Sequence, residues 1–257
     1  MSLPLENIKI VLTRSETQSQ KDILELEKLG AKVLSFSTII ISKLDDYSGT
    51  DKILKNVNDF DYIIFSSTNS VEYFIQRISE LQIQINFDKI KIVAIGKGTE
   101  KLLSDSKIKI DFIPTKFSAK DLLSEISVLE IVNKNILIPG STIMRNELYY
   151  GLLNLNANVT KCEVYQNIIP KKSEINISEL ENFNSDLFVF TSPSTFSNFL
   201  EILEIENPKN YFAGKTIAVI GPTTRQTLID KGIEPNIFPH NYDMKNLIEE
   251  ILSYYKN

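Results

Sequence analysis

Short runs of apolar, mostly β-branched residues alternate along the chain with segments in which apolar residues recur at helical spacing. The first run, IKIVL from Ile8, is followed by the helical pattern QSQKDILELEKLG. Gly30 and Gly232 close two helical patterns, as C-cap glycines do. Such alternation, with strands apolar at nearly every position, predicts parallel sheets covered by helices on both faces. The other predicted strands are AKVLSF, YIIFS, KIVAIG, KIDFIP, NILIP, NVTKCEVYQ, LFVFTS, TIAVIG and PNIFP.

The pattern occurs twice. The segment DYIIFSSTNSVEYF from Asp61 is similar to DLFVFTSPSTFSNF from Asp186, and the two start 125 positions apart (186 minus 61). Gly96 and Gly221, which end two further apolar runs, have the same separation. One duplicated unit of this length accounts for nearly the whole chain. We therefore expect two flavodoxin-like doubly wound domains, with every strand-to-helix turn at the carboxyl edge of its sheet.

Two segments depart from this pattern. LSFSTIIISK, from Leu34 to Lys43, and CEVYQNIIPK, from Cys162 to Lys171, look extended where an ordinary repeat would pass to its next helix. Their β-branched residues favour strand over helix. We expect them to pair as a two-stranded β ladder that joins the domains.

Composition narrows the function classes. Lys and Arg number 28 against 33 Asp and Glu, a net charge of -5, and no cationic run indicates a nucleic-acid partner. No apolar run approaches the roughly 20 residues that span a bilayer, so no membrane partner is expected. The N-terminus lacks the pattern of a signal peptide and Cys162 is the single cysteine, so a cytoplasmic location is expected. With His240 as the single histidine, a histidine-rich metal site is excluded, and we expect no metal.

The residues that follow the predicted strands are small, hydroxylic or glycine. Helix N-termini opened by such residues present free N–H groups, which suit phosphates or carboxylates. The same residues are the preferred helix N-caps in any protein, and this alternative stays open. No segment has the Walker A lysine or the full GxGxxG pattern, which counts against nucleotides. The six segments are Thr13–Ser15, Ser66–Asn69, Gly96–Thr99, Gly140–Thr142, Thr191–Ser194 and Gly221–Thr224.

Few ionisable residues are candidates for chemistry. Arg14 and Arg145 follow strands, where they could reach a ligand or lie as solvated surface charges. Tyr165 lies in the second extended segment, where packing is the ordinary role of a tyrosine. The residues by themselves indicate a two-domain α/β protein that binds an anionic small molecule, and no more.

Four motifs follow one another in the second half of the chain: PGSTIMRNEL, LNANVTKCEVYQN, DLFVFTSPSTFSNF and TIAVIGPTTRQTLIDKGIEP. Together with VLTR, FSSTNSVEYF and AIGKGTEKLL in the first half, they resemble the uroporphyrinogen-III synthase family in order and spacing. No single motif is highly specific, but the resemblance covers essentially the whole chain. It implies an interleaved architecture, with a division into sequential halves near residue 130 as the alternative. Residues 1–34 with 171–257 would form one domain, 44–162 the other, and 35–43 and 163–170 the connecting strands.

The resemblance also implies a function. That family takes hydroxymethylbilane, a linear tetrapyrrole with eight carboxylates, and removes its hydroxyl as water. It closes the ring with the D pyrrole inverted, giving uroporphyrinogen III in haem biosynthesis. No metal or organic cofactor is implied, and a monomer is expected. A polyanion of this size would explain donor-rich turns in both halves of the chain.

Residue by residue, the resemblance gives Tyr165 a catalytic role, because it matches the tyrosine in the VYQ context that is proposed to assist departure of the hydroxyl. A phenol with a reference pKa of about 10 suits hydrogen bonding or proton donation. Lys97 and Gly98 depart from the Gly-Pro-Thr-Thr pattern, which weakens the case for Thr99. The expected substrate-binding residues are Arg14, Ser66, Ser67, Asn69, Thr99, Arg145, Ser192, Ser194, Thr223 and Thr224.

Two alternatives from other classes use the same turns. One is a non-catalytic two-domain protein that closes on an anionic metabolite. The other is a flavin-binding flavodoxin-like protein, which a colourless preparation would exclude.

Overall fold

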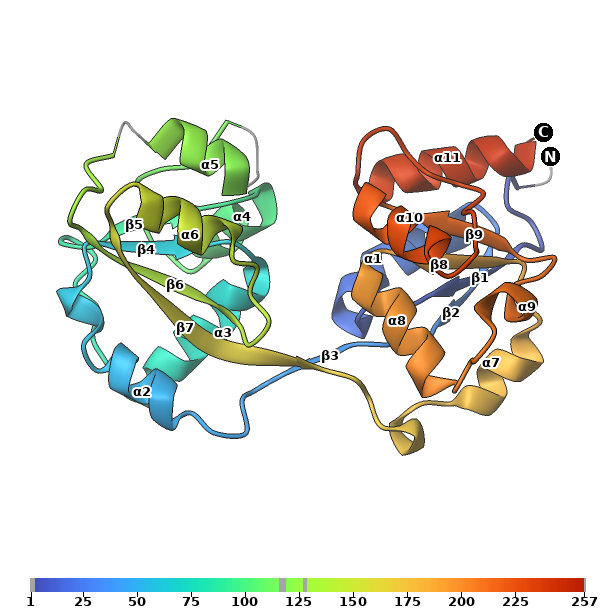
Figure 1. The fold of residues 1–257 in the computed structure, drawn as a ribbon, viewed down its shortest axis with the longest axis horizontal. Helices are drawn as coiled ribbons and strands as arrows, with labels where there is room; N and C mark the ends of the chain where they lie inside the picture. The colour runs from blue at the N-terminus through green and yellow to red at the C-terminus, as the bar shows by residue number, and fades with distance from the viewer. Residues whose placement is uncertain (1–2, 116–118, 127–128, 257) are drawn as a thin grey trace. The chain divides into compact units, whose positions relative to one another are not determined.

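The chain folds into two compact units, each a mainly parallel sheet covered by helices (Figure 1). The computed structural model describes residues 3–115, 119–126 and 129–256. The first unit consists of Met1–Ile40 with Ile168–Asn257, and the second of Ile41–Asn167. The first unit therefore takes its chain from both ends of the sequence, and the second takes its chain from the middle.

The sheet of the first unit has the strand order β2-β1-β8-β9, and every neighbouring pair is parallel. The N-terminal strands, blue in Figure 1, thus lie in one sheet with the C-terminal ones. An isolated parallel bridge joins Ala218 of β9 to Ile237. The strands are β1 (Lys9–Leu12), β2 (Lys32–Ser35), β8 (Leu187–Phe190) and β9 (Thr216–Val219). The helices are α1 (Glu16–Lys28), α7 (Ile177–Phe183), α8 (Pro193–Ile202), α9 (Pro208–Tyr211), α10 (Pro222–Ile229), α11 (Met244–Lys256) and a 3₁₀ turn at Lys172–Glu174.

Alternate residues of each strand pack on opposite faces of this sheet. Ile10 of β1 belongs to a buried cluster with Leu26 of α1 and Leu247 of α11. Val11, the next residue, belongs to a cluster with Phe199 of α8 on the other face. Because side chains alternate across a strand, this is the packing that a doubly covered sheet requires.

The sheet of the second unit has the order β3-β7-β6-β4-β5, in which β7, β6, β4 and β5 run parallel. Helices α3 and α4 share a cluster on one face, and α5 and α6 contribute to the cluster on the other. The strands are β3 (Ile40–Ser42), β4 (Tyr62–Phe65), β5 (Lys91–Ala94), β6 (Asn135–Ser141) and β7 (Asn158–Ile168). The helices are α2 (Ser48–Leu54), α3 (Thr68–Glu80), α4 (Lys97–Asp105), α5 (Ala119–Glu125), α6 (Glu147–Asn154) and a 3₁₀ turn at Val57–Asp59.

The predicted α/β fold with parallel sheets is confirmed. The strands β4 and β8, read from the sequence as YIIF and LFVF, are buried at every position. The first extended segment, expected at 35–43, contains the end of β2 and the short strand β3, with residues 36–39 outside any regular element. None of the helices in the described part of the chain combines the length and apolar content that a bilayer crossing requires.

The aspartates that open the repeated motif have a structural role. Asp61 accepts a hydrogen bond from the backbone N–H of Asn135 at 2.9 Å, and Asp186 accepts one from Lys9 at the same distance. Each carboxylate thereby satisfies an N–H at the start of the neighbouring strand. The repeat seen in the sequence is therefore partly a repeat of strand caps.

Candidate active site

The second unit has a cavity of about 450 Å³ at the carboxyl ends of β4, β5 and β6. Four residues that the sequence singled out line it: Ser66, Ser67, Arg145 and Tyr165. Parallel α/β sheets bind ligands at this edge. The other lining residues are Ile95, Ala119, Ile138, Gly140, Ser141, Ile143, Met144, Glu147, Leu148, Tyr149 and Lys161.

Tyr165 reaches the cavity from β7, which carries one extra residue there. Gly140 of β6 pairs with Glu163 and Ser141 pairs with Tyr165, so that Val164 has no opposite residue. Such a bulge disturbs the alternation of side chains beyond it and can redirect a side chain towards a site. Val164 and Tyr165 are accordingly both buried, 0% and 7% exposed, in one core cluster. The bulge therefore sets the direction in which the tyrosine points.

The N-terminus of α3 forms a second wall. Ser67 is its N-cap: the Ser67 hydroxyl accepts a hydrogen bond from the Ser70 N–H at 3.1 Å, and the Ser70 hydroxyl donates to the Ser67 carbonyl at 2.6 Å. The capping role left open by the sequence is thus real for Ser67. Ser66, just before the cap, is exposed. The first N–H groups of this helix and its dipole still favour an anion in the cavity.

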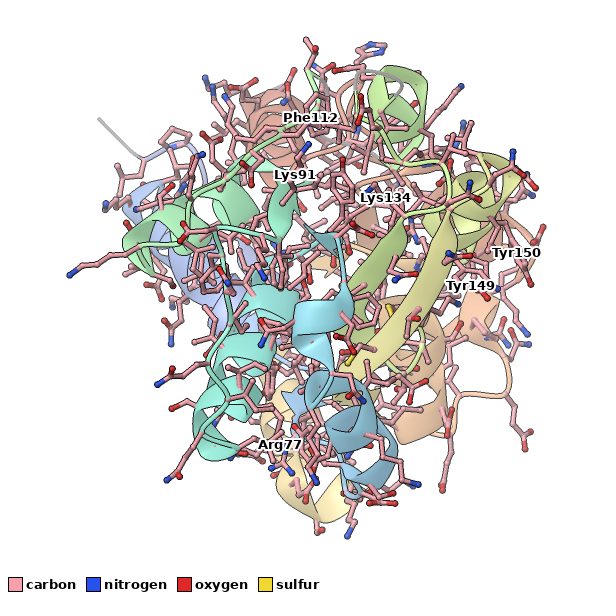
Figure 2. The ribbon with its side chains drawn as sticks, turned by 90° about the vertical axis from the view of Figure 1, so that its left-hand side faces the viewer. Arg77, Lys91, Phe112, Lys134, Tyr149 and Tyr150 are labelled. Carbon is pink, nitrogen blue, oxygen red and sulfur yellow. The ribbon has the colours of Figure 1, made fainter. Side chains whose placement is uncertain are left out.

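Two cations line the same cavity. Arg145 is exposed on the segment between β6 and α6. Lys161 of β7 donates to the side-chain oxygen of Asn146, and its ammonium lies 4.9 Å from the ring centroid of Tyr149, which projects from α6 (Figure 2). Lys161 was not among the residues predicted from the sequence. Only the strand register, which pairs Lys161 with Ile138, places it at the cavity.

Two further predicted residues of this unit lie on helices outside the lining. Asn69 is partly exposed in the first turn of α3. Thr99, at the third position of α4, is 3% exposed. Its repeat partner Thr224, at the third position of α10 in the first unit, is 2% exposed. Both threonines are therefore buried in the first turns of their helices.

The remaining predicted residues belong to the first unit. Arg14 pairs with Asp22 of α1 at 2.8 Å, and burial raises the pKa of Asp22 although the charge of Arg14 opposes it. Ser192 caps α8 as Ser67 caps α3, and its hydroxyl lies 2.9 Å from that of Ser194. Thr223 is exposed at the second position of α10.

Comparison with known proteins supplies the family. A family model described as uroporphyrinogen-III synthase HemD matches residues 21–249. The chain belongs to the uroporphyrinogen-III synthase family. The uroporphyrinogen-III synthase of Chlorobaculum parvum is 27% identical over 241 residues, which cover 91% of this chain and 94% of that protein. That of Synechococcus elongatus is 27% identical over 229 residues, covering 87% and 86%.

Solved structures agree in fold. A mutant uroporphyrinogen III synthase from the extremely thermophilic bacterium Thermus thermophilus superposes with a TM-score of 0.66 at 13% identity, covering 97% of this chain and 99% of that one. The uroporphyrinogen-III synthetase of Helicobacter pylori gives 0.63 at 19% identity, covering 96% and 99%.

For a member of the uroporphyrinogen-III synthase family, the cavity has a suitable donor set. Its polar lining consists of the phenol of Tyr165, the cations Arg145 and Lys161, and the N-terminus of α3. Its apolar lining includes Ile95, Ile138 and Met144. Such a site suits a flat apolar ring that carries carboxylates. The nearby thiol is a poor candidate for chemistry, because burial raises the pKa of Cys162 to about 12.

Proposed function

We propose that this chain catalyses the last step in forming the uroporphyrinogen ring: it cyclises hydroxymethylbilane, with loss of water and inversion of ring D, to uroporphyrinogen III. The observation that carries the proposal is the family match over residues 21–249. The cavity supports it, because the tyrosine expected to assist the reaction lines the same space as two cations.

Carboxylate binding is the first task of such an enzyme. Arg145, Lys161 and the N-terminus of α3 offer donors to carboxylates of the substrate without the dense positive charge that this chain lacks. We propose that donors of the first unit, Arg14, Ser192, Ser194, Thr223 and Thr224, bind further carboxylates. Asn69 and Thr99 complete the proposed set through the helix N-termini on which they lie.

The chemical step needs little acid help. The pyrrole nitrogen electrons expel the hydroxyl, which leaves as water after taking a proton, and the resulting azafulvene is the electrophile. We propose that the Tyr165 hydroxyl donates a hydrogen bond or the proton to the departing oxygen. The substituted carbon of ring D then attacks the azafulvene and forms a spiro intermediate. The older bond from that carbon to the bridge between rings C and D breaks, the bridge carbon bonds the free α carbon of ring D, and that carbon loses its proton, which balances the proton taken by the hydroxyl. Because the substrate also cyclises unaided to the uninverted type I isomer, catalysis rests mainly on holding the chain in the folded geometry.

The finer architecture belongs to the same proposal. The order β2-β1-β8-β9, extended by the bridge to Ile237, corresponds to the flavodoxin-like order 2-1-3-4-5. The order β7-β6-β4-β5, extended by the bridge from Val93 to Phe112, reads 5-4-1-2-3 along the chain of the second unit. It corresponds to 2-1-3-4-5 when each strand takes the number of its repeat partner in the first unit. We propose two flavodoxin-like domains whose connecting strands pair as a ladder, in a monomeric cytoplasmic enzyme that needs no cofactor.

Isomer analysis tests the function. Hydroxymethylbilane is generated in situ, the product is oxidised, and the type I and type III porphyrins are separated by chromatography. Mainly type III is expected. Type I alone, from folded protein, would favour the non-catalytic anion-binding alternative.

A further inference from the structure

The ring of Tyr165 rests on a second tyrosine. Tyr73 of α3 stacks on it with ring centroids 5.4 Å apart and planes inclined by 28°. The Tyr73 hydroxyl donates to the carbonyl of Ile41 in β3 at 3.1 Å. Burial raises the pKa of Tyr73, so it remains a neutral hydrogen-bond donor. One face of the Tyr165 ring is therefore held by a side chain that is itself tied to the neighbouring strand.

The backbone beneath Tyr165 is held separately. Side chains on and just before α2 donate hydrogen bonds to the carbonyls of Glu163 and Val164, the two residues of β7 that precede Tyr165. Thr50 donates to the Glu163 carbonyl, and the Tyr47 hydroxyl donates to the Val164 carbonyl at 3.0 Å. These hydrogen bonds hold the backbone of β7 against α2. The ring of Tyr165 is contacted separately, by Tyr73 of α3.

The ring of Tyr47 is in turn contacted by a cation, the guanidinium of Arg77. The guanidinium of Arg77, labelled in Figure 2, lies 4.2 Å from the Tyr47 ring centroid. It donates two hydrogen bonds to the carboxylate of Asp51, at 2.7 and 2.8 Å. These contacts join α2 to α3, so the supports of the Tyr165 backbone and ring form one assembly.

The hydroxyl of Tyr165 has no hydrogen-bond partner among the described residues. Its place in the cavity is therefore set by the packing of the ring and not by a polar contact. A small rotation about the Cα–Cβ bond is amplified at the oxygen, and misplacement of a reacting group by about 1 Å can cost a factor of 10² in rate. The side chain that fixes the rotation then controls the proton donor.

We propose that Tyr73 is a positioning residue: its ring holds the Tyr165 hydroxyl against the leaving group of the substrate. This inference rests on the proposed function. Tyr73 is not among the described residues that line the cavity, so it acts through Tyr165. Its ring is the essential part, and its hydroxyl is a secondary anchor to β3.

Four variants test this role by steady-state kinetics of type III formation. Tyr73→Leu, which removes the stack, should lower kcat by about 5–10-fold and leave KM within about twofold. Tyr73→Phe keeps the ring and should stay within about twofold of the wild-type kcat. In a Tyr165→Phe background, Tyr73→Leu should cause almost no further loss, because the hydroxyl it positions is absent. Ile75→Ala, which removes another partly buried side chain of α3, should leave kcat within about twofold.

Results that overturn the positioning role of Tyr73 can be told apart from those that overturn the proposed function. A folded Tyr73→Leu protein with wild-type kcat would overturn the inference, and so would an equal fractional loss in both backgrounds, since that indicates a general effect on the fold. If Tyr73→Leu does not fold, Tyr73→Met, whose unbranched side chain adapts more easily to the site, takes its place with the same expected loss. Absence of type III product from the wild type would overturn the proposed function and the positioning role with it.

Discussion

Removal of a single oxygen atom, by Tyr165→Phe, separates chemistry from folding in this molecule. The phenylalanine ring can keep the stack on Tyr73, and the lost hydroxyl leaves no described partner unsatisfied. A neutral hydrogen bond that is not made cannot be lost, so the free energy of unfolding should change by less than about 1 kcal/mol. Chemical denaturation measures this change.

The effect on catalysis should be larger. General-acid assistance is worth roughly 10²–10⁴-fold, and departure of this hydroxyl is intrinsically easy, so the kcat for type III formation should fall by about 10–100-fold. That corresponds to about 1.4–2.8 kcal/mol of activation free energy. Tyr150→Phe is the matched control, because Tyr150 is a 56% exposed tyrosine on α6 outside the cavity lining.

A Tyr165→Phe protein that retains the wild-type kcat would refute the catalytic role of Tyr165. A loss of more than about 2 kcal/mol in stability would also contradict it, since the hydroxyl would then have a structural partner. In either case the role assigned to Tyr165 would have to be withdrawn.

Three further outcomes are expected. Arg145→Ala should raise KM about 3–10-fold with a smaller change in kcat, because Arg145 lines the cavity. Lys109→Ala, at an exposed lysine outside the cavity lining, is the control and should change neither KM nor kcat. Steady-state kinetics of the two variants at two salt concentrations test this. Asp243 caps α11, and hydrogen bonds from Asn246 lower its pKa. Its contribution is fully present above the unfolded pKa near 3.8 and is lost as pH falls through the lower folded pKa. Asp243→Ala should therefore cost about 0.5–1 kcal/mol at pH 7 in denaturation experiments, and progressively less as the pH falls below 3.8. Cys162 should react with a thiol reagent at pH 8 in denaturant but not in the folded protein, because burial raises its pKa to about 12.

Much of the fold could be predicted because its signal is local. The fully apolar strands β4 and β8 are buried at every position, as parallel strands covered on two faces must be. The 125-residue repeat was also visible, since its aspartates and strands have equivalent places in the two sheets. Which strands share a sheet was not visible in the residues alone. That came from the family resemblance.

The site was harder to predict because it depends on register. A bulge of one residue at Val164 decides the direction of Tyr165, and the hydrophobic pattern does not mark it. Lys161 became a candidate only when β7 was aligned with β6. Ser67 was recognised from the sequence, but its role was not. A serine at this position suits both an anion contact and an N-cap, and the structure shows the cap.

The most direct measurement of the central claim is the isomer ratio of the product as the protein concentration rises. Without the protein, hydroxymethylbilane closes to type I. With the protein, the type III fraction should increase with concentration until it dominates, and Tyr165→Phe should need more protein to reach the same fraction. A ratio that stays at type I for folded wild-type protein at every concentration would contradict the proposed function.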